Sequence, residues 1–181
     1  LHVLGRWEPD RSAGTSGGSV TNPELSRLVR AAASISGEGF AGVVASDEDA
    51  ARTEFGVAHD PSALHSEINA LRYLPVPVTV RVETDDVDAV LRELSAAVAT
   101  GSPARFSFAE APEPALTTVL QEVGREWVVQ ADADFDATAK GRVRHLGWRD
   151  LASAFGADID VTVYPGPALP GRLALLAYVH E

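Results

Sequence analysis

From Leu74 onward, valine-rich runs alternate with amphipathic stretches, and this alternation constrains the fold more than any other feature of the sequence. The first run, 76–82, has the composition of a strand, and the stretch after it repeats apolar residues at helical spacing until Gly101. The pattern predicts strands over 76–82, 105–108, 127–131, 143–146 and 159–164, and helices over 87–98, 114–123, 134–140, 148–155 and 172–180. Parallel strands need crossover connections, so this alternation predicts a doubly wound, mostly parallel five-stranded sheet of the Rossmann-like α/β class.

The first 74 residues show no strand pattern and are predicted to form a linker and a helical arm. Residues 11–22 are rich in Gly and Ser, as flexible linkers are, and the apolar piece 1–7 is expected to pack against another part of the protein. Asn22 and Pro23 are typical of a helix start, and a second helix is predicted from Ser46 to Phe55. We therefore expect a linker and arm over 1–74 and a Rossmann-like domain over 75–181.

The charge balance and the missing residue types exclude several classes of function. The chain holds 26 acidic and 15 basic side chains, for a net charge of −11, which would repel a nucleic acid. With no cysteine, it has neither a cysteine nucleophile nor a Cys-ligated metal site. No apolar run approaches the ~20 residues of a membrane span, and no signal peptide opens the chain, so we expect a cytoplasmic location. The absence of methionine leads us to expect a piece of a longer protein.

A Rossmann-like sheet invites a search for a nucleotide site after its first strand. The turn at 83–86 contains no glycine and carries Asp85 and Asp86, which disfavours a pyrophosphate. The same residues, with Asp132 after the third strand, suggest a phosphoacceptor receiver site. Such a site needs a lysine at the end of the fifth strand, where this chain has Tyr164, and its single lysine is Lys140. We interpret these carboxylates as helix caps and solvated turn residues, and we assign no cofactor-binding residue.

Two further patterns share part of the spacing or residue types of a metal or catalytic site. The spacing of Asp132, Asp134 and Asp136 opens like a calcium loop, but Ala137 and Val143 stand where that loop needs Gly and Glu, so capping of a short helix is the better interpretation. The histidines at 2, 59, 65, 145 and 180 have no paired ligand spacing, and no Gly-x-Ser-x-Gly elbow presents a nucleophile. The aromatic residues are predicted to lie in the core. We assign no catalytic residue and no metal ligand.

Three stretches resemble one known family. Residues 67–81 are similar to the Glu-x-Asn-x-Leu-Arg-Tyr-x-Pro segment of the bifunctional proline dehydrogenase/1-pyrroline-5-carboxylate dehydrogenases, the proline utilisation A family, and of its actinobacterial members. Residues 163–167 and 171–176 resemble that family's Tyr-x-Gly-Pro…Gly-Arg-x-Glu-Leu-Leu close, although Ala174 stands where the family usually has Glu. Residues 4–7 resemble the stretch just past its aldehyde dehydrogenase domain.

The resemblance implies a C-terminal domain that is a degenerate copy of an aldehyde dehydrogenase Rossmann domain, with a further strand after residue 181. Such a domain is non-catalytic: it covers the catalytic domains upstream in the same polypeptide and helps to seal the channel that carries the semialdehyde between active sites. The parent would be an oxidoreductase that uses FAD and NAD, with neither cofactor bound in this part. An oligomer is compatible with the resemblance.

Within the first resembling stretch, we expect Glu67, Asn69, Arg72 and Tyr73 to fix the arm on the α/β core, with ordinary turn hydrogen bonds as the alternative. For the whole chain, the alternative function is a regulatory or ligand-binding α/β module with a vestigial nucleotide site.

Overall fold

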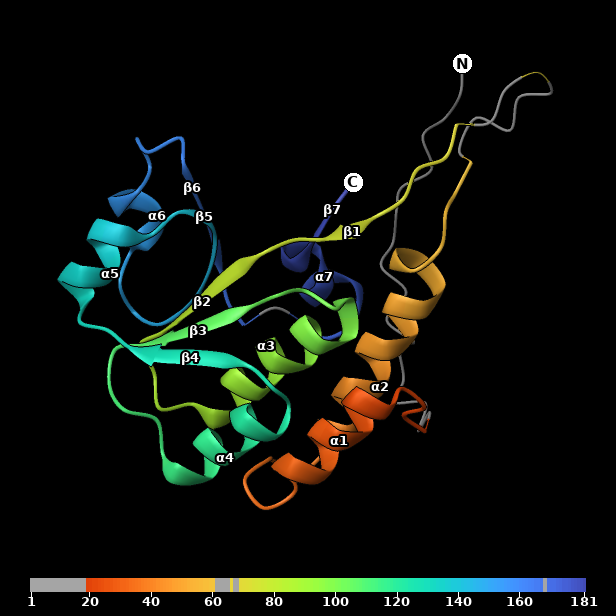
Figure 1. Cartoon of the computed structure of the whole chain (residues 1–181), viewed down its shortest axis with the longest axis horizontal. Coiled ribbons are helices and arrows are strands. Elements are labelled where there is room, and N and C mark those ends of the chain that lie inside the picture. The colour runs from red at the N-terminus through yellow and green to blue at the C-terminus, as the bar shows by residue number, and fades with distance from the viewer. Residues whose placement is uncertain (1–18, 61–65, 67–68, 168) are drawn as a thin grey trace, which may run out of the picture.

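The centre of the molecule is a five-stranded parallel sheet in the order β4-β3-β2-β5-β6 (Figure 1). The computed structural model describes residues 19–60, 66, 69–167 and 169–181, so the predicted apolar piece 1–7 and most of the linker lie outside the described residues. The parallel strands are β2 (Val78–Val82), β3 (Arg105–Phe108), β4 (Glu126–Val129), β5 (Gly141–Leu146) and β6 (Val161–Pro165). The predicted α/β class and its five-stranded parallel sheet are confirmed.

Helices cover both faces of this sheet and form the arm. They are α1 (Pro23–Ala32), α2 (Phe40–Ala50), the π-helical turn η1 (Ala51–Phe55), α3 (Val87–Thr100), α4 (Pro114–Glu122), α5 (Asp132–Thr138), α6 (Leu151–Ala154), α7 (Arg172–Leu175) and the 3-10 turn η2 (Leu176–Tyr178). Gly101 follows α3 with φ of +70°, a left-handed conformation that ends a helix at little cost for glycine. The stop predicted there is confirmed.

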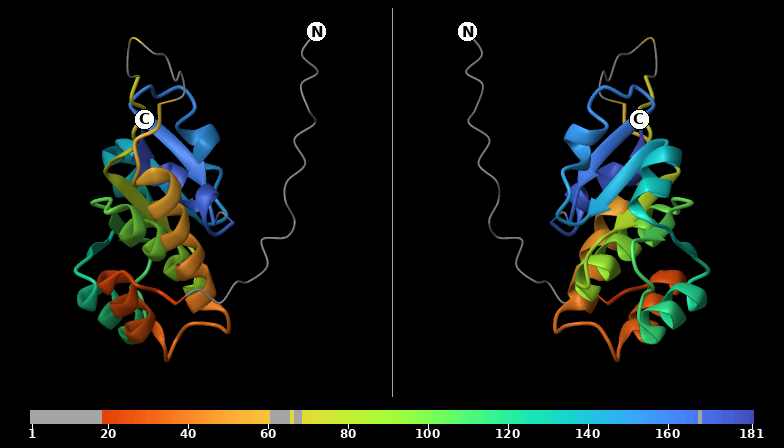
Figure 2. Two further views of the ribbon diagram at one scale, coloured as in Figure 1. Left: turned by 90° about the vertical axis from the view of Figure 1, so that its right-hand side faces the viewer. Right: turned by 90° about the vertical axis from the view of Figure 1, so that its left-hand side faces the viewer.

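Two apolar clusters hold the layers together. The larger one joins β2 and β3 to α3, α4, α7 and the arm, and its members include Leu28, Val44, Val80 and Leu94. The smaller one lies on the other face, beneath α5 and α6, and consists of Phe135, Val143, Leu151 and Val161. In both views of Figure 2 the orange helix α2 runs beside α3, as their contacts require. The arm and the sheet thus share one core, and the division at residue 74 stays a prediction.

The C-terminal helix predicted over 172–180 is wrong beyond Tyr178. The chain makes only the short turns α7 and η2 and then extends as β7 (Val179–His180), which pairs antiparallel with β1 (Leu74–Pro75). Arg142 on β5 explains the change, because its Nη1 donates to the carbonyls of Ala177 (3.1 Å) and Val179 (2.6 Å). These carbonyls are held by a side chain instead of by a further helical turn, and the chain end lies beside β1 (Figure 1).

Two predicted helix starts also differ from the structure. The second arm helix begins at Phe40 rather than at Ser46, because Phe40 and Val44 are buried and extend its apolar face toward the N-terminus. The helix predicted from 148 begins at Leu151, after its N-cap Asp150. Among the described residues, no helix is both long and apolar enough to cross a membrane.

Candidate functional site

The carboxyl edge of the parallel sheet is the place where ligands bind in doubly wound folds, next to the point where the strand order reverses. The chain here runs from β2 outward through β3 to β4 and then places β5 on the other side of β2, so β2 and β5 flank the reversal. A cavity of about 610 Å³ opens at this edge. Residues lining it include Glu83, Asp85, Asp86, Phe108, Glu110, Glu113, Leu116, Asp132 and Trp148. We take this edge as the candidate site.

The turn after β2 does not fit a nucleotide phosphate. The Asp86 carboxylate accepts a hydrogen bond from the Ala89 amide at 3.0 Å, so the positive end of α3 is capped by the chain itself. The turn has no glycine that would let a phosphate approach the backbone, and Glu110 and Glu113 add negative charge from the loop after β3. The predicted role of Asp86 as a helix cap is confirmed, and the surroundings of this cap would repel a pyrophosphate.

Arg81 lies at the carboxyl end of β2 and is fully buried. Its guanidinium donates from Nη1 to Ser107 Oγ (3.0 Å) and the Gln130 carbonyl (2.8 Å), from Nε to Glu83 (3.2 Å), and from Nη2 to Asp132. The hydrogen bond from Arg81 lowers the pKa of Asp132 below its ordinary value. A buried arginine with carboxylate partners ties β2 to β3 and to the start of α5.

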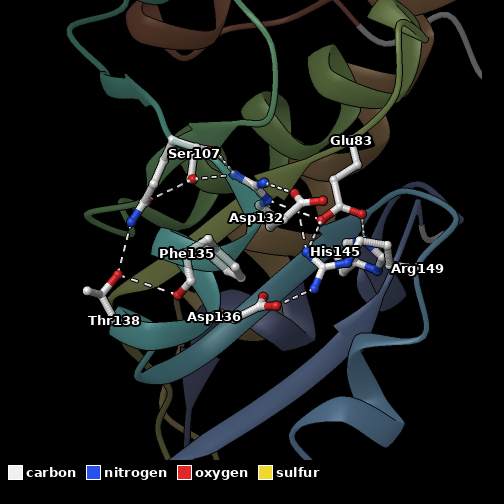
Figure 3. Close-up of polar contacts among 10 residues, drawn as sticks. Glu83, Ser107, Asp132, Phe135, Asp136, Thr138, His145 and Arg149 are labelled. Carbon is white, nitrogen blue, oxygen red and sulfur yellow. Dashed lines mark hydrogen bonds and ion pairs between the residues drawn. The ribbon is translucent and has the colours of Figure 1, made fainter.

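Glu83 pairs with Arg81 and with two further residues, His145 and Arg149. We call the connected set the ion-pair cluster; it consists of Arg81, Glu83, Asp132, Asp136, His145 and Arg149. Its side chain is 3% exposed, and its carboxylate contacts His145 Nε2 at 3.0 Å and Arg149 Nη1 at 3.2 Å. Arg149 also pairs with Asp132 and Asp136. Figure 3 shows these side chains converging from β2, β5, α5 and the loop after β5.

Gly147 permits the close approach of β2 and the loop after β5. A Cβ atom at this position would lie 2.6 Å from the Cβ of Glu83 and 2.7 Å from His145 Nε2. Any larger residue would push the Glu83 side chain away from its partners. The next residue, Trp148, is 84% exposed at the cavity, so its predicted core position is wrong. His145, in contrast, is buried, and its Nε2 is hydrogen-bonded to Glu83.

The charged groups of the ion-pair cluster are already paired with one another. Two arginines face three carboxylates, and the arginines and Glu83 would have to give up protein partners to contact a substrate. The predicted helix-capping role of Asp132 differs from the structure, because α5 has no side-chain cap and Asp132 pairs with the arginines. Within the described part of the chain, no group of three His, Asp or Glu side chains could hold a metal ion.

A second set of buried charges lies on the other face of the sheet and was missed by the sequence analysis. Glu93 on α3 accepts from Arg144 Nε and from the Tyr178 hydroxyl, both at 2.8 Å, and all three side chains are buried. Burial raises the pKa of the Tyr178 hydroxyl, which therefore stays protonated. The sequence signals for this set were Glu93, a charged residue within the apolar helix 87–98, and Arg144, a charged residue within the apolar strand 143–146.

Asp47 joins this second set from the arm. One oxygen accepts from Ser95 Oγ on α3 at 2.6 Å, and the other accepts from the amide of Gly171 at 2.6 Å. The residue is fully buried, and burial raises its pKa from 3.8 to about 6. Gly171 has φ of +79°, and a Cβ there would lie 2.8 Å from Ser46 Oγ. The glycine of the second resembling stretch thus permits a close contact between the arm and the C-terminal segment.

The four residues of the first resembling stretch have different surroundings. Glu67 lies outside the described residues, and Asn69 is exposed in the connection that leads to β1. Arg72 is exposed and makes no hydrogen bond or ion pair with residues that the structure describes. Tyr73 is half-buried, and its ring packs edge-on against Phe55 of the arm, with 4.9 Å between ring centres. Their predicted joint role stays a prediction.

Comparison with known proteins places the fold in context. No protein-family model matches the chain, and no curated protein sequence does. Among solved structures, the chain is similar to Proline Utilization A (PutA) from Corynebacterium freiburgense, with 26% sequence identity and a TM-score of 0.58. The match covers 90% of this chain and 14% of that one, so the chain spans about a seventh of the length of the PutA. Over nearly its whole length, this chain has the fold of one part of a PutA.

Proposed function

We propose that the chain is a non-catalytic, C-terminal domain of a bifunctional proline-catabolic enzyme. The similarity to one part of a PutA carries the proposal, and the pairing of Arg81, Glu83 and Arg149 with one another and with other protein groups at the carboxyl edge supports it. In this proposal the domain is a degenerate, aldehyde dehydrogenase-like Rossmann unit that packs on the upstream catalytic domains of the same polypeptide. It helps to seal the path of the reactive intermediate from the proline dehydrogenase site to the 1-pyrroline-5-carboxylate dehydrogenase site.

A covering role fits the physical character of the molecule. A domain that excludes water contributes surface and rigidity rather than acid–base groups. The ion-pair cluster and the shared core supply that rigidity by tying β2, β3 and β5 to one another and to the arm. FAD and NAD are proposed for the parent enzyme only, and the carboxylates around the turn after β2 are unfavourable for a dinucleotide here. The proposed parent works in the bacterial cytoplasm.

The test of this role uses the longer polypeptide that carries the chain. Deleting 19–181 should lengthen the lag before NADH appears from proline, and should increase the intermediate trapped by o-aminobenzaldehyde in solution. Each half-reaction, assayed with its own substrate, should persist. An unchanged lag with both half-reactions intact would refute the covering role.

A ligand-binding module is the second candidate, and the cavity of about 610 Å³ at the carboxyl edge is the observation that favours it. Titration calorimetry of the chain with NAD⁺, with proline and with glutamate separates the two candidates. The covering role predicts no binding heat for any of them. Saturable binding that is lost in Trp148→Ala, at the mouth of the cavity, would favour the second candidate.

We also propose that Tyr73 carries most of the arm-fixing role assigned to the first resembling stretch, because its side chain packs both on Phe55 and against the core cluster that the arm shares with the sheet.

A further inference from the structure

One buried carboxyl group links the arm to the C-terminal segment, beside the more exposed ion pair between Glu54 and Arg172. Asp47 on α2 is bonded to α3 through Ser95 and to the backbone before α7 through Gly171, which lies 124 residues further along the chain. Three separate segments therefore meet at one side chain with no exposed surface. A group in this position contributes to the contact among those segments.

The buried groups around Asp47 contain more acidic side chains than basic ones. From α3 comes Glu93, from β5 Arg144 and from η2 Tyr178, and all are buried. Glu93 already takes Arg144 as its ion-pair partner, at 2.8 Å, and the tyrosine is a neutral donor. Within this set one buried cation serves two buried carboxyl groups, and among the residues that the structure describes Asp47 has no cationic partner.

The other elements that pack on α2 do not correct this imbalance. The buried side chains of α1 are Leu25, Leu28 and Ala32, all apolar. From η1 and α7 come Glu54 and Arg172, which pair with each other at 2.7 Å and are 30% and 55% exposed. An ionised Asp47 would therefore leave one uncompensated negative charge in the interior, which is costly.

Both hydrogen bonds of Asp47 survive protonation. The Gly171 amide can donate to the carbonyl oxygen of a neutral carboxyl group, and the hydroxyl oxygen can donate to Ser95 Oγ, which accepts as well as donates. The neutral form keeps the three segments joined without an excess charge. The ionised form keeps the same contacts only at the cost of that charge.

We propose that Asp47 is a proton-operated latch that holds the C-terminal segment 171–180 against the arm, closed when the carboxyl group is protonated and loosened when it ionises. The direction follows from linkage: the contact is stabilised below the pKa of an exposed aspartate and is progressively weakened as pH rises through the higher pKa of the buried one. Its loosening frees the segment that carries Leu173 and Leu176, which are already 52% and 37% exposed. The inference is independent of the proposed function.

Amide hydrogen exchange of the intact chain tests the latch at Gly171. The ordinary and buried pKa values, 3.8 and about 6, give a fall in the protection of this amide of about fifty-fold between pH 4 and pH 7, after correction for intrinsic exchange rates. Asp47→Asn, which cannot ionise, should show a flat profile. Asp49→Asn is the matched control, since Asp49 is an exposed residue of the same helix, and it should follow the wild type. A flat wild-type profile, or equal slopes in wild type and Asp47→Asn, would overturn the proposal.

A second measurement covers the case in which Asp47→Asn does not fold. The carboxyl carbon of Asp47 in the wild-type chain can be followed by NMR across the same pH range. A midpoint near 6 with a coincident change at the Gly171 amide supports the latch. A midpoint below about 4.5 would show that the buried carboxylate is ionised without penalty and would overturn it.

Discussion

Glu83 offers the sharpest test of whether the candidate site is a structural ion-pair cluster. Its carboxylate is 3% exposed and lies between Arg81, which is 0% exposed, and Arg149, which is 17% exposed. Glu83→Gln keeps the shape of the side chain and removes its charge. Arg81 then keeps Asp132 as its carboxylate partner, and that carboxylate is 48% exposed.

The magnitude follows from the burial of the partners. Removing one member of a buried ion pair costs ~3–5 kcal/mol, because the other charge stays in the interior without compensation. Asp132 remains as a partner here, so we expect the free energy of unfolding to fall by about 3 kcal/mol, at the lower end of that range. With a urea m-value of about 2 kcal/mol/M, the unfolding midpoint should drop by about 1.5 M.

The assay is urea unfolding followed by tryptophan fluorescence and by circular dichroism, whose transitions should coincide. Asp85→Asn is the control, because Asp85 is exposed on the rim of the same cavity, and its effect should stay within about 0.5 kcal/mol. A loss below about 1 kcal/mol for Glu83→Gln would refute the structural interpretation. A gain in stability would instead indicate that the Glu83 charge destabilises the fold and serves to bind a ligand.

Three further changes probe other parts of the structure. Gly147→Ala should lower the free energy of unfolding, measured by urea unfolding, by about 2 kcal/mol or more, since its Cβ would lie 2.6 Å from that of Glu83. An unchanged free energy of unfolding would mean that the loop moves freely to make room. Between pH 4 and pH 7 the free energy of unfolding of the wild type should fall by about 2 kcal/mol more than that of Asp47→Asn. The reason is that folding raises the pKa of Asp47 to about 6, so the stabilisation present below pH 3.8 is lost as the carboxyl group ionises. If thermal unfolding shows the same pH dependence for both proteins, this prediction is wrong. Tyr73→Ala should lower the free energy of unfolding by about 2 kcal/mol through the lost packing on Phe55, whereas Arg72→Ala, at an exposed side chain, should change it by no more than about 0.5 kcal/mol. Equal effects of the two variants in chemical unfolding would show that Tyr73 does not carry the role proposed for it.

The helices and strands of this protein could be predicted where neighbouring residues decide them. The valine run at 76–82 and the apolar stripe after it depend on spacing within one segment, and they lie where expected, as β2 and α3. Asp86 caps a helix that starts beside it, and Gly101 ends the same helix. The parallel sheet follows as well, because alternating strands and helices with short links can close only through crossovers.

The ion pairs and the C-terminal strand depend on partners far away in the chain. Glu83 and His145 are 62 residues apart and meet because β2 lies beside β5. Val179 extends because it pairs with Pro75, and its own neighbours predict a helix. Asp47 has the sequence context of a helix cap and becomes a buried link to Gly171 only when α2 packs against α3 and α7.

The sequence by itself therefore determined the layers of the fold, because periodicity is a local property that each segment carries alone. It also predicted, from two carboxylates and the lack of glycine, that the turn after β2 disfavours a nucleotide phosphate. Only the tertiary structure decided which buried charges neutralise one another, and that Asp47 has no cationic partner in the described part of the chain. The physical reason is that ionisation depends on burial and on partners brought together by strand order, and neither is written in the spacing of nearby residues.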